Sequence, residues 1–352
     1  MEAIYLHLNN QNYLDSFSSL PEDKKNQIDN YTPLNKPMQL MINSCIEGRL
    51  LSFNSQEAVN KCYLLYHIEQ SDIQINAIGI SNPKKVQGYM HLYVPLIAAS
   101  ISRIIKLNAN SSNWNIFLFT DSKTEAIINE FVNERFSYAK ENITLISIQD
   151  ENAQYPMWFR FHIFRYALKK MSEVDLTQTE IYCIDSDYIP SQRLNSLSPF
   201  LNQSDIVFTT NKDSYPLWQI NEGVYAVKAN NSAVTFFNYC SYIYESLIID
   251  QVVRDSWKNP KIWRGAQAAL MLSTFNFQDT HKSQQNCTIN LNIKENLVTI
   301  RRFSGEYLNN PPCSLFNIGN WGIDKSRGYH FTGNHKYNPK LKEFIQYCTS
   351  SD

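Results

Sequence analysis

The stretch Thr179–Pro190, TEIYCIDSDYIP, decides how the rest of the chain is interpreted. Its part Ile181–Ile184 is β-branched and aromatic and carries no charge, which is typical of a buried strand in a parallel sheet. Asp185 and Asp187 follow at the carboxyl end of this strand. In an extended backbone, residues i and i+2 point to the same side, so we expect both carboxylates to face one small region. Open α/β sheets bind ligands just outside the carboxyl ends of their strands.

Two neighbouring carboxylates repel each other unless a cation lies close to them. Mg²⁺ and Mn²⁺ are commonly held by one or two carboxylates together with the phosphates of a substrate. The pair Asp185 and Asp187 therefore indicates a site for a metal ion and a diphosphate. The alternative is a solvated turn, in which Asp and Ser are common, but the apolar strand before the pair favours metal binding.

Composition limits the classes of protein to consider. The chain has 352 residues, 43% of them hydrophobic and 18% charged, which is enough for a large core in one big domain or two ordinary ones. A formal net charge of −1 gives no basic surface for nucleic acid or an anionic membrane, and we expect neither as a partner. The 7 cysteines are widely spaced and form no CxxC pair, so neither a disulfide framework nor a zinc site is expected.

The amino-terminal sequence has no basic region followed by an apolar one, and no apolar window in the chain reaches the roughly 18 residues of a membrane-spanning helix. We therefore expect no transmembrane segment and a cytoplasmic protein, with export through an unrecognised signal, for example as a secreted effector, as the alternative. Residues 1–58 are polar and rich in Asn and are interpreted as an appended segment of unknown role. Residues 59–340 are interpreted as one large domain, followed by a tail at 341–352.

Strands and helices alternate from Cys62 onward, which predicts βαβ crossovers and a mostly parallel sheet. The expected strands are Cys62–Ile68, Trp114–Thr120, Ile143–Ile148 and Ile181–Ile184, and the expected helices are Tyr89–Leu107, Ser122–Phe136 and Met157–Met171. Two further strands, Asp205–Thr210 and Glu222–Val227, are only a short loop apart, which favours an antiparallel addition to the sheet. A buried helix is expected at Ser232–Val253, and Gly319–Gly333 is expected to be a loop.

A second group of chemically useful residues is His330–Lys336, HFTGNHK. A neutral imidazole can complete the coordination of a metal ion beside carboxylates. Gly333 would allow close approach of the backbone to a phosphate, and Lys336 would supply a positive charge for it. Each of these residues alone is more often an ordinary surface or core residue, so the interpretation depends on the set together with Asp185 and Asp187.

Three weaker motifs complete the pattern. Arg160 lies in an apolar helix, WFRF, where a buried guanidinium needs either a structural carboxylate or a ligand phosphate, and Arg165 is a competing candidate. Glu222 lies at the start of a strand, in Asn221–Val224, and is either a solvent-facing residue or a site carboxylate. Gln267 lies in the segment Arg264–Gln267, which begins a helix-like AQAALML, and is either a polar core residue or a group directed at a substrate.

Taken in order, these pieces resemble the glycosyltransferases of the GT-A fold, most closely the retaining family 8 that includes glycogenin and lipopolysaccharide galactosyltransferases. The family pattern is a helix with an arginine, a strand ending in DxD, an N-[SA]-G-V segment, a G-D-Q segment that opens a helix, and a late H-F-x-G-x-x-K. In this chain the pattern falls on Arg160, Asp185, Asp187, Asn221, Gly223, Gly265, Gln267, His330, Gly333 and Lys336. It spans most of the chain, from about Cys62 to Lys336, and its most specific piece is HFTGNHK.

The resemblance implies an α/β fold with a Rossmann-like, mixed and mostly parallel central sheet flanked by helices. It implies a nucleotide-diphosphate sugar donor, usually a UDP-sugar, and transfer of a hexose or N-acetylhexosamine with retention of configuration to an unknown glycan, lipid or protein acceptor. Mn²⁺ or Mg²⁺ would be held by Asp185, Asp187 and His330, and Lys336 would contact the diphosphate. Arg160, Asn221 and Gln267 would line the sugar.

The chain departs from the family pattern at three places. Ala266 replaces the family Asp, Glu222 replaces a Ser or Ala, and Tyr337-Asn338 replaces Pro-Trp. We hypothesise that Glu222 supplies the missing carboxylate, either as a stabiliser of positive charge on the sugar or as a base. Two alternatives stay open: a sugar-nucleotide hydrolase or nucleotidyltransferase that uses the same site, and a catalytically silent module that binds a sugar nucleotide or a protein.

Overall fold

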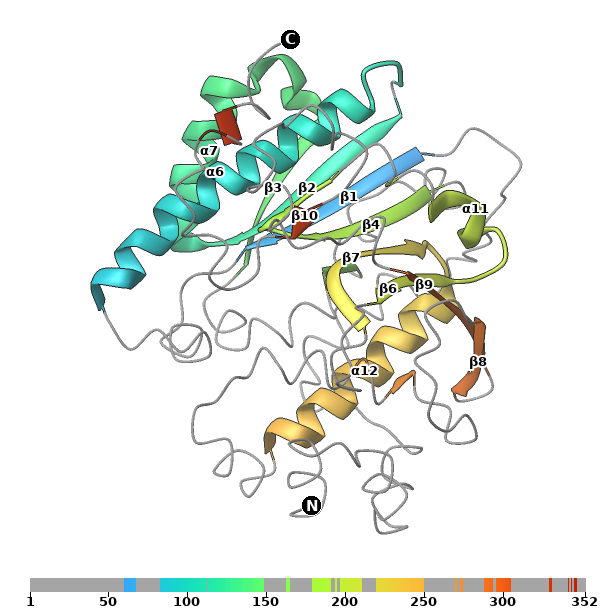
Figure 1. Cartoon of the computed structure of the whole chain (residues 1–352). Helices are drawn as coiled ribbons and strands as arrows, with labels where there is room; N and C mark the ends of the chain where they lie inside the picture. Colours follow the sequence, from blue (N-terminus) through green and yellow to red (C-terminus); the bar gives the residue numbers. More distant parts are fainter. Residues whose placement is uncertain are drawn as a thin grey trace.

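The computed structural model describes residues 60–67, 83–111, 113–148, 163–164, 179–190, 194, 197–210, 220–249, 270, 273–274, 288–293, 296–304, 329–330, 341, 343 and 345–346. Eight of its strands form one sheet in the order β3-β2-β1-β4-β7-β6-β9-β8, and β10 and β5 form a small second sheet. Within the described residues, four neighbouring pairs of the large sheet are parallel and three are antiparallel. The fold is therefore α/β with a mixed, mostly parallel sheet (Figure 1).

The first half of the sheet is built from βαβ units. Strands β1 (Asn60–His67), β2 (Trp114–Asp121) and β3 (Ile143–Ile148) run parallel, joined by helices α6 (Pro83–Leu107) and α7 (Ser122–Arg135) and a short 3₁₀ segment, η1 (Ser137–Asn142). Strand β4 (Thr179–Asp185) then pairs in parallel with β1. No helix in the described part of the chain is both long enough and apolar enough to cross a membrane.

The second half of the sheet introduces antiparallel neighbours. After β4 come the two-residue strand β5 (Tyr188–Ile189), helix α11 (Ser198–Leu201), β6 (Ile206–Thr210), β7 (Ile220–Lys228) and helix α12 (Asn231–Ile249). Strand β7 lies antiparallel between β4 and β6. The hairpin β8 (Thr288–Ile293) and β9 (Asn296–Ser304) extends the sheet beyond β6, and β10 (Tyr329–His330) pairs with β5.

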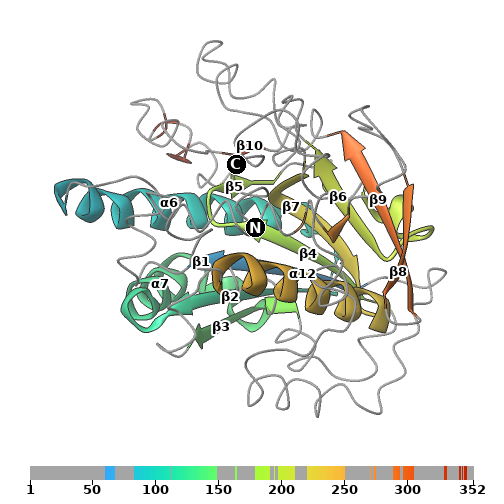
Figure 2. The ribbon, with the colours of Figure 1, turned by 90° about the horizontal axis from the view of Figure 1, so that it is seen from below.

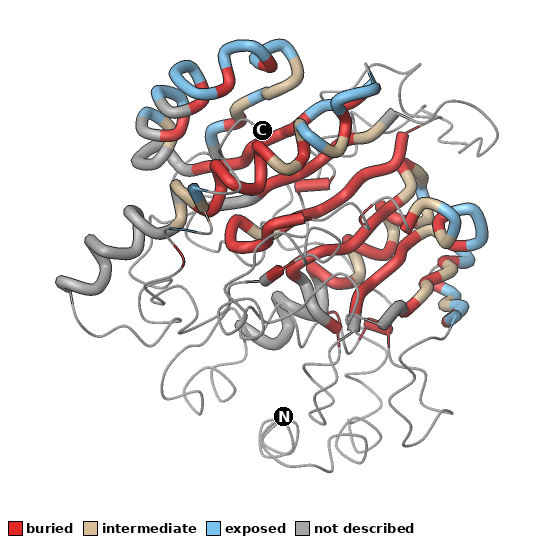
Figure 3. Tube along the Cα trace, turned by 45° about the horizontal axis from the view of Figure 1, so that its top comes forward, coloured by how far each residue is buried: buried red, intermediate tan, exposed pale blue. Residues whose placement is uncertain are grey.

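Both faces of the sheet are buried, which explains why β1 and β4 are apolar at successive positions. On one face, side chains such as Tyr63, Tyr182 and Val224 share a hydrophobic cluster with Ile101 of α6 and Ile128 of α7. On the other face, aromatic rings of the sheet and of α12 pack together: Phe208 on Phe236 at 5.9 Å, and Tyr225 on Phe237 at 5.9 Å between ring centroids. Figure 2 shows α6 and α12 on opposite sides of the sheet, and Figure 3 shows the central strands buried along their length.

The structure confirms the predicted fold class and the antiparallel addition of β6 and β7. The main differences from the expected elements are the following. Helix α6 begins at Pro83 rather than at Tyr89, the β8–β9 hairpin was not predicted, and Tyr329–His330 form a short strand inside a segment that we expected to be a loop. In the segment Met157–Met171 the described residues are 163–164, and both are helical.

Candidate functional site at the carboxyl end of β4

The carboxyl ends of the parallel strands β1, β2 and β4 meet at one edge of the sheet. Asp185 is the last residue of β4 and lies beside Tyr66 of β1 in the strand register. Its side chain is partly exposed, whereas Asp187 is buried with 7% of its surface exposed. Ser186 and Asp187 form a turn between β4 and β5, so the backbone does not stay extended across the pair as we expected. Both aspartates nevertheless lie close together in the chain, at the carboxyl end of β4, and this is the edge at which open α/β sheets bind ligands.

The short sheet of β5 and β10 brings the late HFTGNHK segment to this edge. Tyr329 pairs with Ile189, and His330 pairs with Tyr188, the residue directly after Asp187. The backbone of His330 therefore lies directly opposite Tyr188, one residue from Asp187. In the sequence, His330 and Asp187 are 143 positions apart. Tyr188 and Tyr329 are both buried, at 0% and 2% exposure, so the pairing is part of the packed interior.

A bulge in β7 brings the segment Asn221–Gly223 to the end of β4. Phe208 of β6 pairs with Tyr225 of β7, but the next residue of β6, Thr209, pairs with Asn221. Strand β7 therefore contains extra residues at this point. The hydroxyl of Thr209, which is fully buried, donates a hydrogen bond of 3.0 Å to the carbonyl of Val224 inside this irregular segment. On the other side Val224 pairs with Ile184, so Gly223 and Asp185 are the next residues beyond the last pair of β4 and β7. Bulges often occur beside active sites, where they redirect side chains.

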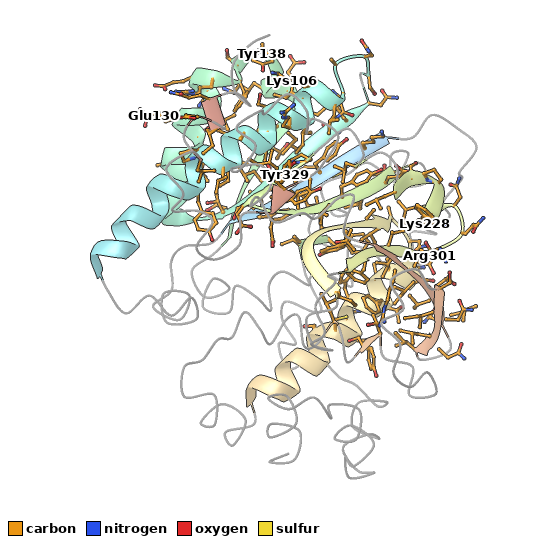
Figure 4. The ribbon with its side chains drawn as sticks, in the orientation of Figure 1. Lys106, Glu130, Tyr138, Lys228, Arg301 and Tyr329 are labelled. Atoms are coloured by element: carbon orange, nitrogen blue, oxygen red, sulfur yellow. The ribbon has the colours of Figure 1, made fainter. Side chains whose placement is uncertain are left out.

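The opposite end of β4 holds a different polar cluster. Glu180 is 1% exposed and accepts hydrogen bonds from the Tyr182 hydroxyl, at 2.6 Å, and from the Ser198 hydroxyl. Lys61 is the cross-strand neighbour of Glu180, and burial lowers the pKa of its ammonium group while Glu180 opposes this shift. Lys228, at the end of β7, pairs with Glu180, and Figure 4 shows it far from Tyr329 of β10. Because the cluster lies at the amino end of β4, we assign it a structural role.

The remaining predicted site residues are described in part or not at all. For Asn221, Glu222 and His330 the structure describes the backbone, and Gly223 is buried. The four residues Arg160, Gln267, Gly333 and Lys336 lie outside the described residues. Among the side chains that are described, no group of three or more His, Cys, Asp and Glu lies close enough to hold a metal ion. The predicted ligand set therefore consists of two described carboxylates and a histidine placed by its backbone.

Two polar residues at the same edge were missed by the sequence reasoning. His67 is the last residue of β1 and pairs with Thr120, and Asp121 is the last residue of β2. Neither residue belongs to a motif that the sequence pattern singles out. The signal that could have found them is their position, because polar residues that end adjacent parallel strands gather at one edge of the sheet.

No family model and no curated protein matches the chain in sequence. Among solved structures, similar ones are the glycosyltransferase GlyE of Streptococcus pneumoniae, at 12% identity and a TM-score of 0.45, and the bifunctional glycosyltransferase WbbM, at 10% and 0.41. A third is mouse xyloside xylosyltransferase 1, at 10% identity and a TM-score of 0.41. That alignment covers 79% of this chain and 99% of the xylosyltransferase. The alignments cover 84% and 85% of this chain but only 61% of GlyE and 51% of WbbM. At these low scores, any functional conclusion has to come from the residues of this chain.

Proposed function

We propose that this protein is a metal-dependent glycosyltransferase that takes a sugar from a nucleotide-diphosphate donor, a UDP-sugar, and transfers it with retention of configuration. The observation that carries the proposal is the meeting of three segments at one end of β4. These segments are Asp185–Asp187 at the strand end, Asn221–Gly223 at the bulge of β7, and His330 on β10. They are separated in the sequence, and each carries one part of the motif pattern described above.

The three metal ligands suit a hard divalent cation. Mn²⁺ accepts two carboxylates and an imidazole, whereas Mg²⁺ prefers the carboxylates. Asp185, Asp187 and His330 would hold this ion, which when bound supplies positive charge to the departing diphosphate. Lys336 would add a second positive charge there, and Gly333 would let the backbone approach a phosphate oxygen.

The sugar would lie between the diphosphate and the β7 bulge. When the bond between the anomeric carbon and the phosphate oxygen breaks, positive charge develops on the sugar ring, and oxygen atoms of nearby side chains stabilise it. Asn221 and Glu222 of the bulge are suited to this role, with Glu222 as the carboxylate in place of the family Asp that is Ala266 here. Arg160 and Gln267 would orient the sugar hydroxyls.

The first test is an assay of UDP release from UDP-glucose, UDP-galactose and UDP-N-acetylglucosamine with Mn²⁺, with and without a panel of acceptors. We expect release to require the metal, to stop when a chelator is added, and to increase with the correct acceptor. Glu222→Gln should lower the rate by about 10²–10⁴-fold, as is typical for loss of an acid–base group or a charge stabiliser. Glu130→Gln, which removes the same charge from the exposed face of α7, is the control.

The assay also separates this proposal from the alternatives. Rapid release of free sugar without any acceptor would identify a hydrolase, and binding of the donor without turnover over the whole acceptor panel would identify a silent binding module. A Glu222→Gln variant that turns over at the rate of the wild-type protein would exclude Glu222 from the chemistry.

A further inference from the structure

The buried serine Ser100 in helix α6 makes a long-range hydrogen bond to the backbone of the site. Its hydroxyl is 0% exposed and donates to the carbonyl oxygen of Tyr188, the residue directly after Asp187. A buried hydroxyl costs free energy unless it finds a partner. In a helix the usual partner is the carbonyl one turn earlier, but Ser100 bonds to a residue 88 positions away.

Tyr188 belongs to a short strand that is packed into the core. Strand β5 is 2 residues long and pairs with the equally short β10, so its ladder can contain few hydrogen bonds. The same residue, Tyr188, pairs with His330. The segments that carry Asp187 and His330 therefore meet at Tyr188. The hydrogen bond from Ser100 attaches this point to helix α6.

We propose that Ser100 is a positioning residue for the metal ligands of this site. It holds the backbone of Tyr188, which fixes Asp187 along the chain and His330 across the strand pair. The inference rests on the proposed function, because it assigns Ser100 a role toward the ion that Asp185, Asp187 and His330 would hold. Groups that orient metal ligands without touching the ion typically change metal affinity by 10–100-fold when they are removed.

Ser204 provides a matched control for Ser100. Its hydroxyl is also buried, at 3% exposure, and also donates to a backbone carbonyl, that of Phe200, at 2.7 Å. Ser204 precedes β6, which runs antiparallel to β7 and hence parallel to β4, so it lies at the amino end of the sheet and away from the site. Ser100→Ala and Ser204→Ala thus each remove a hydrogen bond from a buried serine to a backbone carbonyl, long-range for Ser100 and local for Ser204, at opposite ends of the sheet.

The experiment measures the dissociation constant of UDP in the presence of Mn²⁺ for the full chain and both variants, and hydrogen exchange of their backbone amides. We expect Ser100→Ala to weaken metal-dependent UDP binding by about 10–100-fold and Ser204→Ala to leave it within about twofold. Exchange in Ser100→Ala should accelerate by roughly fivefold to tenfold at residues 187–189 and 329–330, as expected for loss of one hydrogen bond. If Ser100→Ala does not fold, Ser100→Cys keeps a weak donor in a similar volume and should show the same effects at smaller size.

The outcomes separate the inference from the proposed function. Wild-type affinity in Ser100→Ala would overturn the positioning role while leaving the glycosyltransferase proposal intact. If the wild-type protein does not bind UDP with Mn²⁺, the proposed function fails. In that case faster exchange confined to residues 187–189 and 329–330 would still support anchoring by Ser100, and exchange equal to that of Ser204→Ala would overturn it.

Discussion

At the scale of single residues, Glu180 shows how this sheet accommodates a buried carboxylate. The Tyr182 hydroxyl donates to one of its oxygens at 2.6 Å, and Ser198 donates to the other. Burial, and after it Glu180, raises the pKa of Tyr182 well above its usual range, so the hydroxyl keeps its proton and remains a donor. The ring of Tyr182 also stacks on Tyr63, with 5.4 Å between ring centroids and 20° between planes.

Removing this one donor should be costly. We expect Tyr182→Phe to lower the free energy of unfolding by about 1–3 kcal/mol, because a buried carboxylate oxygen loses a hydrogen bond while the ring stacking is kept. Urea unfolding measures the change. Tyr138→Phe removes the same hydroxyl from a side chain that is 72% exposed and should stay within about 0.5 kcal/mol of the wild-type value. Equal losses in the two variants would show that the Tyr182–Glu180 bond adds nothing specific.

At the scale of elements, Asp205 joins the β8–β9 hairpin and α12 to the sheet. One carboxylate oxygen accepts from the Asn230 amide at 2.7 Å, and the other accepts from the Thr299 backbone N–H of β9 at 2.8 Å. The side-chain oxygen of Asn230 accepts from the N–H of Ala233 in the first turn of α12, as a helix cap does. The side chains of Asp205 and Asn230 thus connect the start of β6 with β9 and α12.

This connection predicts a coupled loss of stability. Asp205→Ala leaves the Thr299 N–H and the Asn230 amide without this acceptor and should cost about 1–3 kcal/mol, and Asn230→Ala should cost about 1 kcal/mol through the lost cap. Because the two residues share a hydrogen bond, the double variant should lose less than the sum of the single losses, by about 0.5 kcal/mol or more. Thermal or urea unfolding of the four proteins measures this, and strict additivity would contradict the shared connection.

The elements that could be predicted from the sequence are those with a strong local signal. Strand β3 has the predicted bounds, and β4 was recognised from its apolar run because its side chains are buried on both faces. Strand β8 alternates between exposed and buried residues, a signal that was present but was obscured by Asn290 and Asn292. In β9, the inward-facing Arg302, bonded to Thr274, interrupts the apolar pattern. Strand β10 is too short for any periodicity, and its pairing with β5 depends on the tertiary fold.

At the scale of the whole molecule, the sheet order determines which motifs meet. The sequence identified Asp185, Asp187, the Asn221–Gly223 segment and His330 as separate pieces. Their proximity depends on the pairing of β4 with β7, the bulge between β6 and β7, and the pairing of β5 with β10. The pairings of β4 with β7 and of β5 with β10 join distant parts of the sequence, and the bulge between β6 and β7 has no periodic signal, so periodicity alone could not predict where these motifs meet. The turn at Ser186–Asp187 likewise follows from the start of β5, which the sequence did not indicate.

The same arrangement explains why the site and the structural clusters lie apart. The Glu180 cluster lies at the amino end of β4, and Asp205 lies at the amino end of β6. The proposed ligands lie at the carboxyl end of β4, where the bulge and the short strand pair interrupt the regular sheet. Changes at the amino end should therefore affect stability more than binding, and changes at the carboxyl end should do the reverse.

The measurement that tests the central proposal most directly is calorimetric titration with UDP in the presence of Mn²⁺, on the wild-type protein, Asp187→Asn and Glu130→Gln. We predict metal-dependent binding by the wild-type protein and by Glu130→Gln, and a loss of at least about 100-fold in affinity in Asp187→Asn, because Asn removes the ligand charge and keeps the shape. Melting curves without ligand check that Asp187→Asn is folded. Binding by Asp187→Asn as tight as that of the wild-type protein, or no metal-dependent binding by the wild-type protein, would contradict a metal–diphosphate site at the end of β4.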